Sequence, residues 1–250
     1  MKIKEIYNFL TELAPLEKAM PYDNAGFLIG DLNNEVTSAL VVLDCTCNVV
    51  EKAVEQGANL IITHHPIIYN PLKKITAQEN KRIYDCIANG ITVISMHTNL
   101  DVVENGVNDA LASALNLKNV MPITDEEGFT FKYGILNKEI SAEDFARQIK
   151  ATLGGVVRYV DANKPIKTVA VCGGSGSTFC DLAMRYADCL VTADVKHSAF
   201  IDASQKGFIL FDVGHFHSEN VIVNPLAKKL SEKFEGVNFE AVNEGVIKTF

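Results

Sequence analysis

Short runs of β-branched residues alternate with helical patterns along most of this 250-residue chain, and this alternation constrains its fold more than any other feature. Residues 39–43, 60–63 and 91–95 are strand-like, and helical patterns near residues 48–56 and 78–88 separate them. Strands that alternate with helices are typical of βα units wound around a mostly parallel sheet. We therefore expect an α/β fold.

A second series of the same kind follows a predicted loop at residues 121–128. Its strands are expected near residues 129–136, 156–160, 168–172, 189–192 and 208–211. The sequence thus predicts two similar α/β halves, residues 1–127 and 128–250, with mostly parallel or mixed sheets flanked by helices. The final segment could pack back onto the first half.

Composition excludes several classes of function. The net charge of −8 and pI near 5.3 lack the basic footprint of a nucleic-acid binder. No apolar run approaches the roughly 20 residues of a membrane helix, so we expect a cytoplasmic protein with no membrane partner. The six cysteines are expected to be buried, reduced thiols. Cys45 and Cys47 could form a soft-metal pair, although burial at a strand end is the simpler interpretation.

Five of the six histidines lie at places that directly follow predicted strands. They are His64, His65, His97, His215 and His217. Because parallel sheets bind ligands outside the carboxyl ends of their strands, these side chains are expected at a functional edge. A lone histidine is more often structural, but this clustering favours a metal site.

The spacing between histidines and carboxylates adds detail. His215 and Glu219 are four residues apart, which places imidazole and carboxylate on one face of a helix that begins after Gly214. His97 and Asp101 have the same separation. His217 is expected to point away from His215, since Phe216 lies between them.

The adjacent residues His64 and His65 are expected to diverge, because successive side chains of an extended strand point to opposite faces. Two neighbouring metal ions would suit them better than one. Imidazole and carboxylate are the ligands of Zn, Mn or Fe(II) hydrolytic centres, and a bridging carboxylate can hold two ions about 3.5–4 Å apart. The spacing therefore predicts a two-metal site.

Five short motifs occur in an order that identifies a family. They are Asp23-Asn24-Ala25-Gly26-Phe27, Thr63-His64-His65-Pro66, His97-Thr98-Asn99-Leu100-Asp101, Thr192-Ala193-Asp194-Val195-Lys196-His197, and Gly214-His215 with Glu219. In these motifs the chain resembles, essentially end to end, the Nif-three-like family of hexameric dinuclear-metal proteins, often called GTP cyclohydrolase I type 2 homologues. Its length is that of the short form, which lacks an inserted domain.

The resemblance implies a metal site in the cleft between the two halves. It implies two divalent ions per subunit, Zn, Fe or Mn, and a ring of six subunits. The implied ligands are His64, His65, Asp101, His215 and Glu219, with Glu219 bridging the ions.

His97 and His197 are the candidate catalytic residues. We assign His97 to the wall of the site, where it would orient a ligand or act on substrate, and its role as a ligand stays open. His197 is either a proton carrier or a histidine on a helix surface. The turn at residues 173–177 either binds a phosphate through its backbone N–H groups or only connects a strand to a helix. Residues 23–26 either line the site or form a turn.

A two-metal centre of this kind would activate water, so hydrolysis is the expected chemistry. The family name suggests GTP or a related nucleotide as the small-molecule substrate, with formate as a product. Two alternatives stay open. One is a metallophosphoesterase-like hydrolase, and the other is a non-enzymatic metal-binding or regulatory protein.

Overall fold

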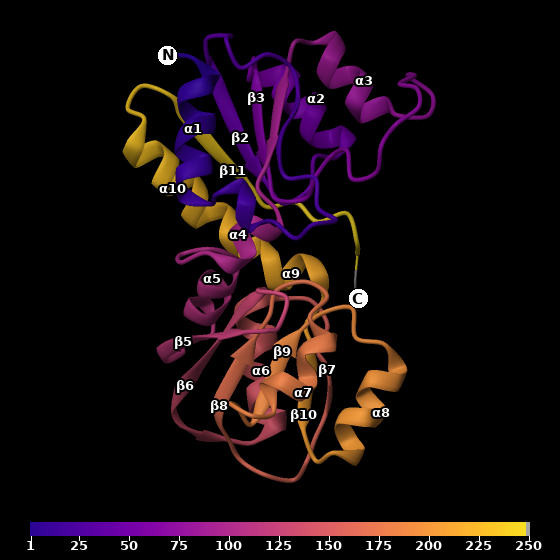
Figure 1. The fold of residues 1–250 in the computed structure, drawn as a ribbon, viewed down its shortest axis with the longest axis vertical. Helices are drawn as coiled ribbons and strands as arrows, with labels where there is room; N and C mark the ends of the chain where they lie inside the picture. The colour runs from indigo at the N-terminus through magenta and orange to yellow at the C-terminus, as the bar shows by residue number, and fades with distance from the viewer. Residues whose placement is uncertain (249–250) are drawn as a thin grey trace. The chain divides into compact units, whose positions relative to one another are not determined.

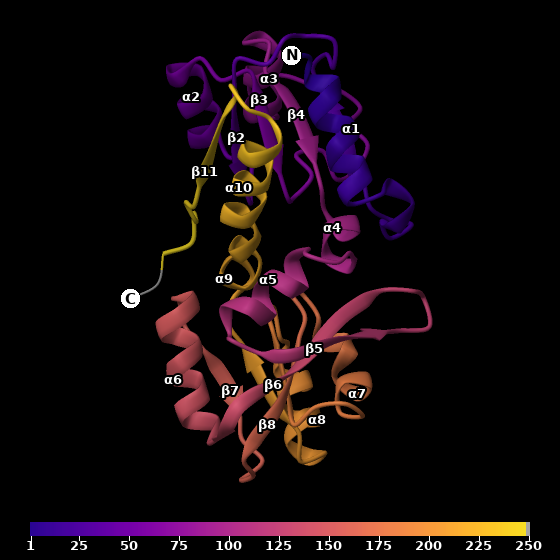
Figure 2. The same ribbon diagram turned by 90° about the vertical axis from the view of Figure 1, so that its left-hand side faces the viewer.

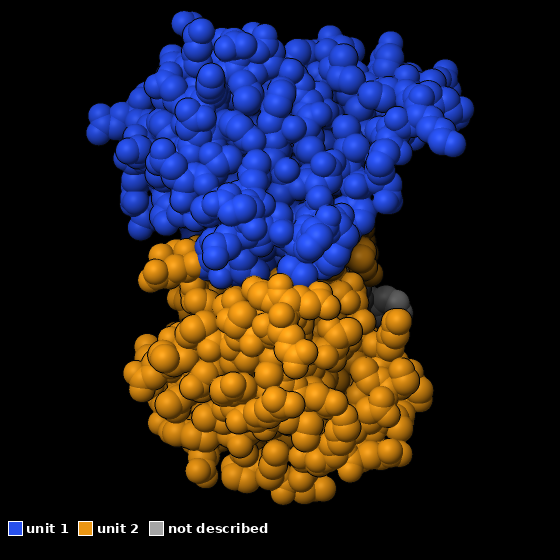
Figure 3. Space-filling model, in the orientation of Figure 1, with its two compact units in different colours: residues 1–103, 223–244 blue, residues 104–222, 245–250 orange. Residues whose placement is uncertain are grey.

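The computed structural model describes residues 1–248, which divide into two units (Figure 3). Unit 1 contains residues 1–103 and 223–244, and unit 2 contains residues 104–222 and the described residues after 244. This division differs from the expected boundary at residue 127. The chain leaves unit 1 after Val103, and it returns at Val223 to add a helix and a strand.

The sheet of unit 1 has five strands in the order β1-β4-β3-β2-β11. They are β1 (Gly26–Ile29), β2 (Ser38–Val42), β3 (Leu60–Thr63), β4 (Thr92–Ser95) and β11 (Asn238–Val242). β11, β2, β3 and β4 are parallel, and β1 is antiparallel to β4. The three strands expected in the first half are confirmed as β2, β3 and β4. The final segment does pack onto the first half, because β11 pairs with β2.

Helices cover both faces of this sheet. Helices α1 (Ile3–Leu13) and α10 (Val223–Lys233) lie on one side, and α2 (Cys47–Gln56) and α3 (Lys81–Ala88) lie on the other (Figures 1 and 2). The short elements η1 (Leu16–Lys18) and α4 (Thr98–Val102) complete the unit. Because both faces are covered, strands β3 and β4 are buried along their whole length.

The sheet of unit 2 has the strand order β5-β6-β8-β9-β10-β7. Its strands are β5 (Lys118–Thr124), β6 (Thr130–Ile140), β7 (Arg158–Val160), β8 (Ile166–Val171), β9 (Cys189–Thr192) and β10 (Ile209–Asp212). β8, β9 and β10 are parallel, whereas β5, β6 and β7 pair in antiparallel fashion. The sheet is therefore mixed.

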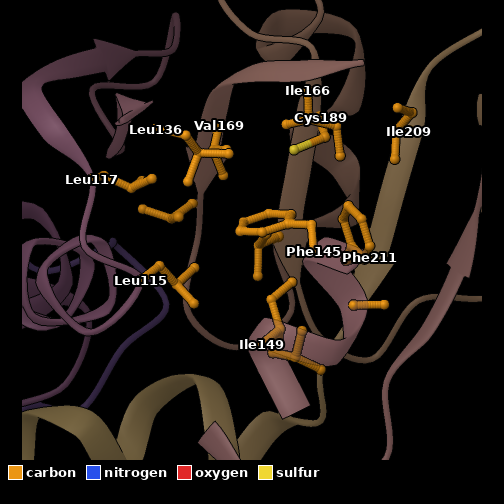
Figure 4. Close-up of a cluster of buried hydrophobic side chains, with 14 of the residues drawn as sticks. Leu115, Leu117, Leu136, Phe145, Ile149, Ile166, Val169, Cys189, Ile209 and Phe211 are labelled. Carbon is orange, nitrogen blue, oxygen red and sulfur yellow. The ribbon is translucent and has the colours of Figure 1, made fainter. Parts of the chain in front are cut away.

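The helices of unit 2 flank this sheet. They are α5 (Val107–Ala114), α6 (Ala142–Leu153), α7 (Cys180–Ala183), α8 (His197–Gln205) and α9 (His215–Glu219), with the short turns η2 (Ser177–Phe179) and η3 (Asn220–Ile222). Phe145 of α6 is fully buried in the main hydrophobic cluster, where its ring meets Phe211 edge-on at 5.4 Å (Figure 4). Burial of aromatic rings in this geometry makes a large contribution to core stability.

One predicted loop is in part a strand. β5 occupies residues 118–124, although residues 121–128 were expected to form a loop. Pro122 suggested that loop, but a proline is compatible with an edge strand, and β5 lies at the edge of its sheet. Among the described residues no helix combines the length and the apolar character needed to cross a bilayer.

Candidate metal site

Three histidines of unit 1 gather where two parallel strands end. His64 and His65 follow β3, and His97 comes two residues after the end of β4. One ring nitrogen from each lies within 4.8 Å of the others. The ends of β3 and β4 thus bring these three side chains together.

The adjacent histidines were expected to diverge, and this expectation is wrong. The rings of His64 and His65 lie 5.1 Å apart, and both belong to the same group of donors. The alternation rule applies only within an extended strand, and β3 ends at Thr63.

Oxygen acceptors fix the orientation of His64 and His65. The Nδ1 of His64 donates to the carbonyl oxygen of Met96 at 2.8 Å, and its Nε2 lies 3.5 Å from a carboxylate oxygen of Asp101. The Nδ1 of His65 lies 2.8 Å from the carboxylate of Asp44. His64 and Asp101 are both buried.

The carboxylate of Asp23 holds His97. Its Oδ1 lies 2.7 Å from Nδ1 of His97, and its Oδ2 accepts hydrogen bonds from the backbone N–H and the hydroxyl of Thr98. Burial by itself would raise the pKa of Asp23, but the hydrogen bonds from His97 and Thr98 outweigh it and lower the pKa from 3.8 to about 2. Asp23 is therefore an anion at neutral pH. Because a carboxylate can only accept a hydrogen bond, Nδ1 of His97 is the donor in this contact, and Nε2 is the ring nitrogen that does not face Asp23.

Unit 2 contains a second set of side chains that could bind a metal ion. Helix α9 begins after Gly214 (φ +81°), as predicted, and its first and last residues are His215 and Glu219. The Nε2 of His215 lies 2.9 Å from Oε2 of Glu219, which is buried. The Nδ1 of His215 lies 2.7 Å from Asp194, a residue in the left-handed region at φ +51°.

The turn at residues 173–177 uses its backbone N–H groups internally. Three of them donate to side-chain oxygens of unit 2: Gly173 to Asn108, Gly174 to Ser218, and Gly176 to Thr192. The distances are 2.8–2.9 Å. These bonds favour the structural interpretation of the turn over phosphate binding.

The remaining histidines lie apart from these donors. The Nδ1 of His217 is 3.0 Å from the carbonyl oxygen of Leu153, and its ring packs on Gly155. His197 is exposed at the start of α8. In the described part of unit 2, no hydrogen bond or ring contact joins His197 to His215 or Glu219.

The donors present fit a divalent transition metal. Imidazole nitrogens and carboxylate oxygens suit Zn, Mn and Fe. Histidines that bind such metals usually donate their second ring nitrogen to a carboxylate or a carbonyl, and His64, His65, His97 and His215 all show this arrangement. The structure therefore contains groups that could hold a metal ion.

Sequence reasoning gave no orienting role to three carboxylates that hold these rings. Asp44 directly follows a strand, so the criterion that selected the histidines would have found it. Asp23 and Asp194 lie in recognised motifs, but their pairing with His97 and His215 spans 74 and 21 residues of sequence. Only the tertiary structure reveals such pairs.

A two-sheet α/β fold with imidazole and carboxylate donors defines a candidate metalloprotein. The chain belongs to the DUF34/NIF3 family, because the family model described as "Duf34/NIF3 (NGG1p interacting factor 3)" matches residues 1–247. The resemblance seen in the sequence motifs is thus confirmed.

Relatives cover nearly the whole chain. A Clostridium perfringens protein named "GTP cyclohydrolase 1 type 2 homolog" is 34% identical over 94% of this chain and 93% of its own length. A crystal structure of a Staphylococcus aureus hypothetical protein has a TM-score of 0.92 and 32% identity, and the match covers 100% of this chain and 99% of that chain. "Reduced HcgD from Methanocaldococcus jannaschii" has a TM-score of 0.84 and 29% identity, with 96% and 98% covered.

Proposed function

We propose that this protein is a dinuclear-metal-dependent hydrolase that acts on GTP or a related nucleotide and releases formate. The substrate class is suggested by relatives named GTP cyclohydrolase 1 type 2 homolog. The proposed ligands of the two divalent ions (Zn, Fe or Mn) are His64, His65 and Asp101 in unit 1, and His215 and Glu219 in unit 2.

The orientation of the histidines is the observation that carries this proposal. Each proposed histidine ligand has Nδ1 held by an oxygen acceptor at 2.7–2.8 Å. That bond fixes the tautomer and makes Nε2 the ligand atom. Metal-bound histidines almost always have such a partner for the second ring nitrogen, and in unit 2 the contact of His217 with the Leu153 carbonyl is longer, at 3.0 Å.

The proposed chemistry divides between the metal and the protein. When bound, the two ions would supply Lewis-acid activation of water and of the bond under attack. His97 would carry the proton, because Asp23 fixes its Nδ1 and its Nε2 is the nitrogen that can accept or donate one. His197, exposed at the start of α8, is the second proposed proton carrier.

Separate assays for formate and phosphate test this function on metal-loaded protein. We expect GTP to yield formate, and we expect activity to disappear on chelation and return with Mn, Zn or Fe(II). Asp101→Ala should lose metal and turnover together, because it removes a ligand. His97→Ala should keep its metal and lose about 10²–10⁴-fold in turnover, the usual contribution of a general acid or base.

A product other than formate would support a different function. Phosphate without formate would indicate a phosphoesterase. Absence of both products from every nucleotide tested, with the metal fully bound, would contradict a hydrolase and favour a metal-binding or regulatory role.

We also propose that six subunits assemble into a ring, as the family resemblance implies. Closed cyclic symmetry is common among soluble homo-oligomers. Light scattering over a range of concentrations should give six times the 27.4 kDa of one chain. A mass that stays at 27.4 kDa would contradict the assembly.

A further inference from the structure

Unit 1 contains a surface recess that the proposed metal ligands do not explain. Its volume is about 440 Å³, within the size range of small-molecule sites. The buried side chains of Ile67 and Ile83 contribute an apolar floor, and Tyr69, Asn80 and Arg82 add aromatic, amide and cationic groups. This combination of an apolar surface with a few polar groups is typical of ligand sites.

One wall of the recess belongs to an unusually long loop. Residues 64–80, between β3 and α3, contain no helix or strand. Loops of this length within a compact unit are usually functional. The loop also exposes three large apolar side chains, Tyr69, Leu72 and Ile75. Tyr69 and Leu72 also line the recess, so their exposed apolar surface is available to a bound molecule.

Tyr69 connects the recess to the candidate catalytic histidine. Its ring meets that of His97 edge-on, with centroids 6.3 Å apart, and 44% of the tyrosine is exposed. The adjacent carbonyl oxygen of Ile68 accepts a hydrogen bond from Nδ2 of Asn24 at 2.6 Å. Asn24 follows Asp23, which holds His97. The same turn thus fixes the aromatic wall and the histidine.

Arg82 gives the recess an uncompensated positive charge. Its guanidinium donates to the carbonyl oxygen of Cys45 at 3.3 Å, and within residues 1–248 no carboxylate forms an ion pair with it. The other charged side chains that line the recess are already paired, Lys81 with Asp85 and Glu79 with Lys74. An anion would therefore be attracted here, although the whole chain carries a net charge of −8.

We propose that this recess binds the substrate of the proposed hydrolase, and that the substrate is a nucleoside phosphate. The base stacks on the exposed face of Tyr69, next to His97, and the phosphate meets the guanidinium of Arg82. An aromatic ring recognises the face of any nucleobase, and a guanidinium is well matched to phosphate. This inference rests on the proposed function and adds the location and chemistry of substrate recognition.

Equilibrium binding to metal-loaded full-length protein tests the location. The probes are GTP and guanosine. Tyr69→Ala should weaken both by about tenfold or more, as expected for the loss of one base stack, and Tyr69→Phe should bind as the wild type does. Arg82→Gln should weaken GTP binding by about fivefold or more and leave the affinity for guanosine unchanged. Tyr84→Ala is the matched control, because Tyr84 is equally exposed on α3 but does not line the recess.

Kinetics separate this inference from the function on which it rests. If GTP turns over, Arg82→Gln should raise KM and leave kcat near the wild-type value. GTP turnover with an unchanged KM in both Tyr69→Ala and Arg82→Gln would contradict substrate binding in the recess. It would leave the proposed hydrolase function intact. Failure of the wild type to bind or hydrolyse any nucleotide would overturn the proposed function as well.

Metal content and assembly mass are also measured for each variant, to detect indirect effects. Metal content should be unchanged in every variant. Loss of metal from Tyr69→Ala would show that the loop supports the metal ligands and would overturn the inference. A smaller assembly mass for Tyr69→Ala would show that the apolar loop contacts another subunit, and this result would overturn it too.

Discussion

Asp194 adopts a backbone conformation that few residues other than glycine tolerate. Its φ of +51° brings its carboxylate within 2.7 Å of Nδ1 of His215. Asparagine and aspartate are the least strained non-glycine residues in this region. Local strain of this kind is often found at functional sites, which agrees with a role for Asp194 in orienting a ligand.

Replacing Asp194 tests that role. Asp194→Asn keeps a side chain that tolerates φ +51° but removes the charge that fixes the ring of His215. We expect metal affinity to fall about 10–100-fold with little change in stability, as for other partners of metal-bound histidines. Competition with a chelator of known affinity measures this, and Asp202→Asn, an exposed change in the same unit, is the control. Equal affinities for the two variants would contradict the role.

Gly174 makes room for the carboxylate of Glu219. A Cβ on Gly174 would overlap Oε1 of Glu219 and would lie 3.3 Å from Cε1 of His215. We expect Gly174→Ala to displace the carboxylate and to weaken metal binding at least about tenfold, which isothermal titration of the metal-free protein can measure.

A second glycine of unit 2 provides a control for backbone strain. Gly207 has a φ of +64°, close to the +61° of Gly174, but no atom lies within 4 Å of its added Cβ. Gly207→Ala should therefore cost similar stability and leave metal affinity unchanged. Parallel loss of affinity in both variants would mean that strain, not contact with Glu219, is the cause.

Sequence reasoning located the histidines better than their surroundings. His64, His97 and His215 each follow a strand, and strand ends are visible in the pattern of β-branched residues. The direction of each imidazole depends on an acceptor elsewhere, such as the Met96 carbonyl for His64 or Asp23 for His97. These contacts form only when distant segments pack together, so local patterns could not predict them.

At the scale of elements, the buried parallel strands were the most predictable. β3 and β9 are each buried over all four residues, three apolar residues followed by a threonine, and their predicted and observed bounds agree. The edge strands β1, β5 and β11 were not predicted. Their burial is partial, and β11 pairs with β2, which lies 200 residues earlier in the sequence, and no local pattern encodes that pairing.

Asp188 joins the start of β8 to the start of β9. Its carboxylate accepts hydrogen bonds from the backbone N–H groups of Lys167 and Thr168 and from the hydroxyl of Thr168, at 2.8–2.9 Å. Asp188→Asn should lower the free energy of unfolding by about 1 kcal/mol, since hydrogen bonds to a partly exposed charge are weakened by solvent. Denaturant unfolding measures this.

The effect of Asp188 should depend on pH. Burial tends to raise its pKa, but the hydrogen bonds from Thr168 and Lys167 outweigh burial and lower the pKa below the usual 3.8. A lowered pKa adds stability above 3.8, and that stability is lost as the pH falls through the folded-state value. The difference between wild type and Asp188→Asn should therefore be constant near neutral pH and shrink in acid. A difference that grows in acid would contradict this role.

At the scale of the whole chain, the sequence indicated two α/β halves but not how the chain divides between them. Unit 1 is discontinuous, because α10 and β11 return to the first sheet. α10 buries Val223, Leu226, Ala227 and Leu230, and Phe239 of β11 is also buried. Helical periodicity indicates that such residues face a core, but it does not identify which core.

The central claim is that the oriented histidines and carboxylates bind two divalent ions per chain. Titration of metal-free protein with Mn²⁺ or Zn²⁺, followed by elemental analysis after removal of unbound metal, tests it most directly. We expect saturation at about two ions per chain, lower occupancy in Asp101→Asn and Glu219→Gln, and normal occupancy in His217→Asn. Saturation of the wild type at one ion or none would contradict it.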